Sequence, residues 1–283
     1  MFESISSFRK ALEGLVLAAA LSGCYSPTKV VSQPSTSVSL QPDFVRYVSD
    51  LHSRCGAASL EHQEELFRRY IIWENQLSGI WVDPENLTIV PDNPVSAFIS
   101  SGPIGLASIG GTFLYGHIRI RQQSMNLSAI THEVGHGTDL HLNYLGYIFS
   151  QKTRVRVEAV AESFEHYVGL EHIRNGNLAV GLGHLMARPT LPAGGTRLDE
   201  LIDGNTYDAA RSISFILMNQ FGGIKDTWRF LSVTPENGVY ENVQNVILEK
   251  GIGTAILSGY DICEREKAEV LRLGSSSSPV SVK

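Results

Sequence analysis

Two histidines and a glutamate form the most informative short pattern in this chain, with His132, Glu133 and His136 in one run of five residues. Residues four apart on an α-helix share one face and are separated by about 6 Å along the axis. Both imidazoles can therefore reach one metal ion, with bonds of about 2.0–2.1 Å if that metal is zinc. Glu133 can then act on a water molecule held at the metal. The spacing predicts metal-assisted hydrolysis, and the alternative is a chance match.

A third metal ligand is expected downstream, because a catalytic zinc site usually takes three protein ligands and leaves one position open. Apolar residues recur at helical spacing over residues 156–168, which predicts an amphipathic helix. Glu158 follows His136 by 22 positions, which is enough for a turn and a returning helix. We expect Glu158 to complete a site for one Zn²⁺ per chain. Glu162, one turn later, is expected to accept the free N–H of a ligand histidine and to fix its tautomer.

Other third ligands are weaker candidates. The metzincin pattern requires glycine at position 139 and histidine at position 142, where this chain has Asp139 and Leu142. The offset of His141 does not match that pattern, and Asp139 is too close to the second histidine to reach the metal without breaking the helix. Glu162 is the remaining alternative ligand. The alternative without a metal is that both glutamates lie on an ordinary solvated helix face.

The helix that carries Glu158 resembles that of the gluzincin metallopeptidases, in which a glutamate on the helix after the HExxH helix is the third zinc ligand. Thermolysin-like enzymes carry an acidic residue four positions after this ligand, as at Glu162. The run Glu-x-x-Ala-Glu-x-Phe, which starts at Glu158, is similar to the anthrax lethal factor catalytic domain. The resemblance covers about residues 110–170. It implies a zinc metallopeptidase that cleaves peptide or protein substrates, with Glu133 as the general base.

The residue that would stabilise the oxyanion is left open. Lethal-factor-like enzymes place a catalytic tyrosine shortly before the ligand glutamate, but residues 151–157 contain none. Tyr144 and Tyr147 are the nearest candidates. Tyr207 begins a run that resembles a helix beneath the active site of thermolysin-like peptidases. This resemblance makes Tyr207 a third candidate donor, with core packing as the alternative.

The N-terminus has the composition of an export signal. Arg9 and Lys10 precede the apolar run 11–23, which is too short to span a bilayer. The four residues that end at Cys24 resemble the lipobox of bacterial lipoproteins, in which the cysteine becomes lipidated. This implies an exported protein, lipid-anchored in the bacterial cell envelope. Tyr25 implies the outer membrane if the source is Gram-negative. An ordinary secretory signal and a cytosolic helix are the alternatives.

The chain is expected to form an α+β fold of zincin type, with a small mixed sheet, the HExxH helix and a mainly helical C-terminal part. Residues 80–121 contain short β-rich runs, and we expect residues 112–120 to form the edge that binds substrate. The expected division is a signal peptide at 1–23, a flexible tether at 24–42, a zincin N-terminal part at 43–186, a helical C-terminal part at 187–274 and a disordered tail at 275–283.

Helices are expected over residues 42–70, 207–221, 224–233 and 240–250. Ser124, Asn126 and Ser128 are all suitable N-caps for the HExxH helix. Gly135 lowers helix propensity there, and its expected benefit is the close approach of another backbone or of substrate.

Cysteine, histidine and charge patterns carry less information. Cys55 and Cys263 either form a disulfide in an exported protein or stay as buried thiols. Four further histidines lack ligand spacing and are expected at the surface or in satisfied core positions: His117, His166, His172 and His184. His166 is also a candidate for a hydrogen bond next to the site. The net charge of −6 and the lack of a basic stripe argue against nucleic acid.

Two rival functions remain open at this point. One is a non-catalytic envelope lipoprotein that binds a partner on a degenerate zincin scaffold. The complete set of Glu133 and three candidate ligands argues against it, because a non-catalytic site has no need for that glutamate. The other is a zinc hydrolase of cell-wall peptides, which the sequence does not distinguish from a general protease.

Overall fold

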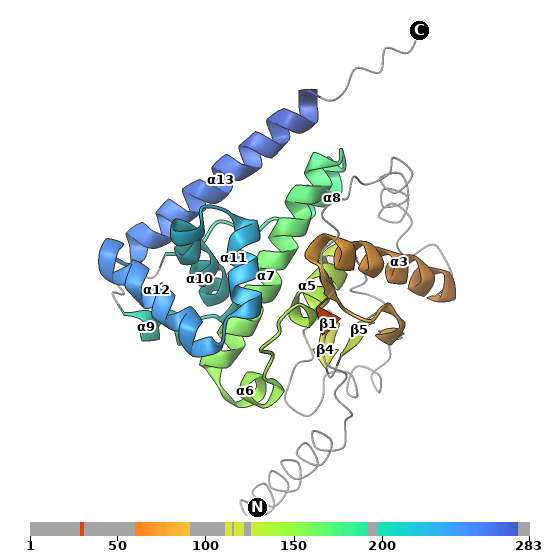
Figure 1. Ribbon diagram of the computed structural model, residues 1–283, viewed down its shortest axis with the longest axis horizontal. Helices are drawn as coiled ribbons and strands as arrows, with labels where there is room; N and C mark the ends of the chain where they lie inside the picture. Colours follow the sequence, from red (N-terminus) through yellow and green to blue (C-terminus); the bar gives the residue numbers. More distant parts are fainter. Residues whose placement is uncertain are drawn as a thin grey trace, which may run out of the picture.

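Helix α7 (Gln151–Arg174) runs through the middle of the computed structural model (Figure 1). Helix α3 (Leu60–Ser78), helix α5 (Leu127–Gly137) and the strands lie on one side of it. The other side holds α10 (Thr206–Phe221), α11 (Ile224–Val233), α12 (Glu236–Lys250) and α13 (Ile252–Ser276). The structure describes residues 29–30, 60–90, 111–114, 116–121, 126–191 and 197–276.

Several predictions fall outside these residues. The signal segment, Cys24, most of the tether and Cys55 are among them. Among the helices that the structure describes, none combines the length and the apolar character needed to cross a membrane.

Helix α7 differs from the amphipathic helix predicted for residues 156–168. It is buried on nearly every face between Val155 and Leu170, with Glu165 as the one partly exposed position. The reason is its central place, because α5 covers one side while α10 and α11 cover the other. A helix that is packed on several sides has no polar face toward solvent. Its sequence therefore does not show which side packs against which neighbour.

A three-stranded mixed sheet precedes the HExxH helix. Its order is β3 (Leu87–Val90), β5 (His117–Arg121) and β4 (Gly111–Leu114), with β3–β5 parallel and β4–β5 antiparallel. Ile118 and Ile120 of β5 are buried while His117 and Arg119 are exposed, which is the alternation seen in the sequence. Of the stretch expected to form the edge, only β4 is an edge strand, since β5 is central.

Two short elements complete the N-terminal part. Strands β1 (Lys29–Val30) and β2 (Ile80–Trp81) form an antiparallel pair. A 3₁₀ helix, η1 (Pro84–Asn86), leads into β3. Helices and a small mixed sheet together make an α+β fold, as predicted.

Helix α5 begins at a defined cap and lies unusually close to α7. The Asn126 side chain accepts a hydrogen bond from the Ala129 N–H at 2.7 Å, so it is the N-cap among the three candidates. A Cβ added at Gly135 would meet the Cα of Ala161 at 2.7 Å. The glycine inside the motif therefore permits close approach of another backbone, which is one of the two benefits expected of it.

Three shorter helices connect the elements described above. They are α6 (Tyr144–Phe149), α8 (Leu178–Gly183) and α9 (Leu198–Ile202). The helices predicted at 207–221, 224–233 and 240–250 are confirmed as α10, α11 and α12. Helix α12 starts earlier than predicted, directly after Pro235. Helix α13 continues past the expected boundary at residue 274.

Candidate metal centre

Three side chains predicted as metal ligands come together between α5 and α7. The Nε2 atom of His132 lies 3.1 Å from the Oε2 atom of Glu158, and the Nε2 atom of His136 lies 3.7 Å from the same oxygen. Within the described part of the chain, this is the one group of three such residues whose donor atoms all lie within 4.8 Å of one another. The structure therefore contains a group that could hold a metal ion.

These distances fit the coordination shell of zinc. Ligand atoms placed about 2.0–2.1 Å from a tetrahedral zinc ion are about 3.3–3.4 Å from each other. The observed separations of 3.1 and 3.7 Å bracket this value. Two imidazole nitrogens and one carboxylate oxygen are also a donor set used by catalytic zinc sites.

The charges around the group favour a cation. Burial raises the pKa of Glu158, but His136, His132 and the Tyr147 hydroxyl outweigh it and lower the pKa to about 2. Burial lowers the pKa of His132, yet its contacts with Glu158 and Glu165 dominate and raise it well above the usual value. Positive charge at His132 is thus held between two carboxylates, and the same carboxylates would stabilise a metal cation.

The two oxygens of Glu158 have different partners. Oε2 faces the histidines, while Oε1 accepts a 2.6 Å hydrogen bond from the hydroxyl of Tyr147. Tyr147 comes from α6, whose N-cap Asn143 accepts a hydrogen bond from the Gly146 N–H. Because Tyr147 occupies Oε1, Oε2 is left to face the histidines and to serve as a single metal-ligand atom.

Glu165 makes the contact that was expected of Glu162. Its Oε2 atom lies 3.3 Å from Nδ1 of His132, and its Oε1 atom accepts a short hydrogen bond from Ser128. Glu162 instead forms an ion pair with Arg211 of α10, with Nε to Oε2 at 3.0 Å. Positions 158, 162 and 165 follow the i, i+4, i+7 spacing of one helix face, and this spacing could have identified Glu165 from the sequence.

Glu133 is almost fully buried beside the group. Burial raises its pKa to about 8, the charge of Glu158 adds to the rise, and His132 together with the main-chain N–H of Phe113 opposes it. Phe113 belongs to the edge strand β4. A divalent cation next to Glu133 would bring its pKa down from this raised value. Glu133 would then be ionised at neutral pH and able to accept a proton.

The three candidate tyrosines occupy different places. The Tyr147 hydroxyl is bonded to Glu158, and the ring of Tyr207 lies 6.2 Å from that of His132. Burial and the charge of Glu158 raise the pKa of Tyr207 to about 12, so its hydroxyl keeps its proton at neutral pH. The Tyr144 hydroxyl accepts a hydrogen bond from the Gly116 N–H at 3.3 Å. Tyr147 and Tyr207 are therefore the tyrosines nearest to the group.

The rival ligands lie elsewhere. His141 is exposed and its Nε2 atom lies 3.0 Å from the Val233 carbonyl oxygen. Asp139 forms a buried ion pair with Arg156. Neither residue belongs to the three-residue group.

The other histidines and Cys263 also lie away from the group. His117 is exposed on β5. His166 accepts a hydrogen bond from the Met186 N–H, and its Nε2 atom lies 3.2 Å from the Cys263 sulfur, so it makes no bond at the metal group. Cys263 is a buried, free thiol, and its candidate partner Cys55 lies outside the described residues, so the disulfide stays a prediction. The pKa of Cys263 is raised to about 12, chiefly by burial.

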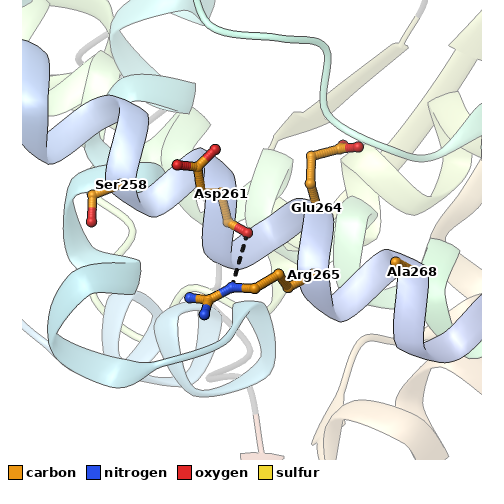
Figure 2. A pocket seen from close by; sticks show the side chains of 5 residues that line it. All are labelled: Ser258, Asp261, Glu264, Arg265 and Ala268. Atoms are coloured by element: carbon orange, nitrogen blue, oxygen red, sulfur yellow. Dashed lines mark hydrogen bonds between the residues drawn. The ribbon is translucent and has the colours of Figure 1, made fainter.

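A surface hollow on α13 offers no comparable arrangement. Figure 2 shows that the side chains lining it all come from one helix and point in different directions. Arg265 donates to the main-chain oxygen of Asp261 at 3.3 Å, which is a contact within the helix. The hollow lacks side chains converging from different elements.

Comparison with known protein families, curated proteins and solved structures gives no match to this chain.

Proposed function

We propose that this protein is a zinc metallopeptidase of gluzincin type, with a zincin-like fold. The observation that carries the proposal is the convergence of two histidine nitrogens and one Glu158 oxygen, with Glu133 beside them. His132, His136 and Glu158 would hold Zn²⁺. A bound zinc ion supplies Lewis acidity, which lowers the pKa of a coordinated water toward about 7 and polarises the scissile carbonyl.

The protein's own residues supply the proton transfers and the positioning. Glu133 takes the proton of the attacking water and returns it to the leaving amine. Glu165 accepts from Nδ1 of His132 and fixes the tautomer that leaves Nε2 as a ligand atom. Tyr147 holds the second oxygen of Glu158. Tyr207, whose ring faces His132, is the tyrosine left to donate a hydrogen bond to the oxyanion.

The edge strand β4 supports a peptide as substrate. It lies against α5, and the N–H of Phe113 already contacts Glu133. An extended peptide can pair with a free strand edge through main-chain hydrogen bonds. We propose that substrate binds along β4 and presents one peptide bond to Glu133. We further propose that lipidation of Cys24 tethers the enzyme to the bacterial envelope.

The test is hydrolysis by the full-length chain of casein and, separately, of cell-wall peptides. Cleavage of either substrate should stop when zinc is removed by a chelator and return when zinc is added back. Glu133→Gln should bind zinc but show almost no cleavage. Cleavage that survives chelation, or equal cleavage by Glu133→Gln, would contradict the proposal. The substrate that is cleaved distinguishes a general protease from a cell-wall hydrolase.

A further inference from the structure

A hydrogen-bond chain of four buried polar side chains meets helix α5 at Thr131, in its second turn. The His172 Nε2 atom is 2.7 Å from the Tyr70 hydroxyl, which is 3.3 Å from the Thr131 hydroxyl. The Thr131 hydroxyl is 3.2 Å from Nε2 of His184. These four residues join α7, α3, α5 and the C-terminal end of α8, and each is at most 3% exposed.

The hydrogen bonds of these four side chains all run in one direction, with each group donating to the next. Nδ1 of His184 donates to the Val180 carbonyl oxygen at 2.8 Å, so Nε2 of the neutral ring is an acceptor. The Thr131 hydroxyl then donates to His184, and the Tyr70 hydroxyl donates to Thr131. The Tyr70 oxygen in turn accepts from Nε2 of His172. This order gives each of these three side-chain contacts one proton.

Thr131 belongs to a stripe that anchors α5 to the rest of the molecule. Thr131, Gly135 and Thr138 are spaced i, i+4 and i+7, so they share one helix face. Gly135 lies against the backbone of Ala161, and the Thr138 hydroxyl accepts from Nε1 of Trp228 at 3.1 Å. These two contacts fix the middle and the end of the helix. Thr131 is a polar anchor in its second turn.

The second turn of α5 is where precise placement matters most. His132 follows Thr131 directly, and its two ring nitrogens meet Glu158 at 3.1 Å and Glu165 at 3.3 Å. A small rotation of this second turn would move the ring away from both carboxylates together. Supporting groups one step removed from a metal ligand are known to tune its affinity.

We propose that Tyr70 and Thr131 are positioning residues that set the orientation of His132 for the metal. This inference rests on the proposed metal site. Their hydroxyls do not touch the metal or the substrate, but act through the second turn of α5. Loss of either hydroxyl should weaken metal binding while the protein remains folded.

The experiment compares Thr131→Val and Tyr70→Phe with the wild type, each as the full-length chain. Ser163→Ala is the matched control, because it deletes a buried hydroxyl bonded to Ser214 of α10 at 2.8 Å, away from α5. Zinc affinity is measured by competition with a chelator, and the ligand geometry by the visible spectrum of the Co²⁺ form. Each of the two variants should bind zinc about tenfold more weakly and change the Co²⁺ spectrum, while the control changes neither.

The double variant sharpens the test. If both hydroxyls act through the same hydrogen-bond chain, the double variant Thr131→Val with Tyr70→Phe should weaken zinc binding little more than either change alone. Tyr70→Phe keeps the ring that stacks on His172 at 5.8 Å, so it decides the matter if Thr131→Val does not fold.

The outcomes separate this inference from the proposed function. A wild type that binds no zinc overturns both. A wild type that binds zinc, with Thr131→Val and Tyr70→Phe matching Ser163→Ala in affinity and spectrum, overturns the inference and leaves the metal site intact.

Discussion

Two buried glutamates near helix α5 behave in opposite ways. Glu158 of α7 is surrounded by groups that favour its charge, and its pKa is lowered to about 2. Glu74 of α3 is completely buried, and neither of its carboxyl oxygens has a hydrogen-bond partner among the described residues. Burial raises the pKa of Glu74 well above its usual value, the charge of Glu165 adds to this, and the nearby Thr131 hydroxyl opposes it.

The difference shows what makes a buried carboxyl suitable for a metal. Burial alone favours the neutral acid, as at Glu74. Partners that donate hydrogen bonds or carry positive charge restore the carboxylate, as His132, His136 and Tyr147 do at Glu158. A cation site therefore needs the donors around the carboxylate as well as the carboxylate itself.

The largest expected effect concerns a third buried glutamate, Glu133. Its replacement by glutamine should lower turnover by about 10²–10⁴-fold, the usual contribution of a general base, with zinc retained. Peptide hydrolysis and zinc content, measured on the same preparation, check this. Glu74→Gln is the matched control and should keep its turnover. Equal losses in both variants would mean that the position beside the metal group has no special role.

The next largest effect is the pH dependence of stability that comes from Glu74. Its pKa is raised in the folded state, so the folded protein keeps a proton that the unfolded chain has lost. The stability that the Glu74 proton contributes is fully present below the pKa of Glu74 in the unfolded chain, which is about 4.3. As pH rises toward the pKa in the folded state, up to about 1.4 kcal/mol of it is lost for each pH unit. Glu74→Gln should remove this loss.

Urea unfolding of wild type and Glu74→Gln from pH 5 to pH 8 measures that difference. The variant should gain relative to the wild type as pH rises, with the smallest gain at pH 5 and the largest at pH 8. Parallel curves would indicate that Glu74 is ionised and partnered in the folded protein, and the contrast with Glu158 would then fail.

Gly135→Ala should destabilise the protein by about 1–3 kcal/mol, because the new methyl group would push α5 away from the Ala161 backbone. Zinc affinity should fall as well, since α5 carries both histidines and α7 carries Glu158. Gly253→Ala in α13 is the control, because its added Cβ meets no atom within 4 Å. It should be stabilising by about 0.5–1 kcal/mol. Thermal unfolding that shows equal stability for both variants would contradict the close contact.

The smallest of these effects should follow from Glu165→Gln. Loss of the carboxylate next to Nδ1 of His132 should weaken zinc binding about tenfold. Glu162→Gln should have less effect, because Glu162 is paired with Arg211 rather than with a ligand histidine. Zinc competition titrations of the two variants decide between them. A larger loss in Glu162→Gln would return the histidine-orienting role to that residue.

Spacing within helices predicted much of the candidate metal centre. His132 and His136 are one turn apart, so local geometry groups them, while Glu158 was added from its distance along the chain and its resemblance to the gluzincin ligand. The partner of Glu162 was not predictable in this way, because Arg211 lies on α10 and reaches α7 only in the folded chain. Glu165 carried a usable signal, its i+7 relation to Glu158.

In the fold too, features with a local sequence signal were predictable, and features set by distant contacts were not. Capping at Asn126 and the glycine at 135 have local signatures, and the structure has both. The order of the sheet and the burial of α7 on all sides depend on contacts between distant segments, which periodicity does not record. Glu74 is the clearest example, because its apolar neighbours Tyr70, Ile71 and Trp73 predict a buried helix face but give no reason for a carboxyl within it.

Zinc content of the purified full-length chain, measured by mass spectrometry, tests the central claim most directly. Wild type, Glu158→Gln and Glu74→Gln should be prepared side by side and shown to be folded. We expect about one zinc ion per chain in the wild type and in Glu74→Gln, and almost none in Glu158→Gln. A folded wild type without zinc, or Glu158→Gln with as much zinc as the wild type, would contradict the assignment of this site.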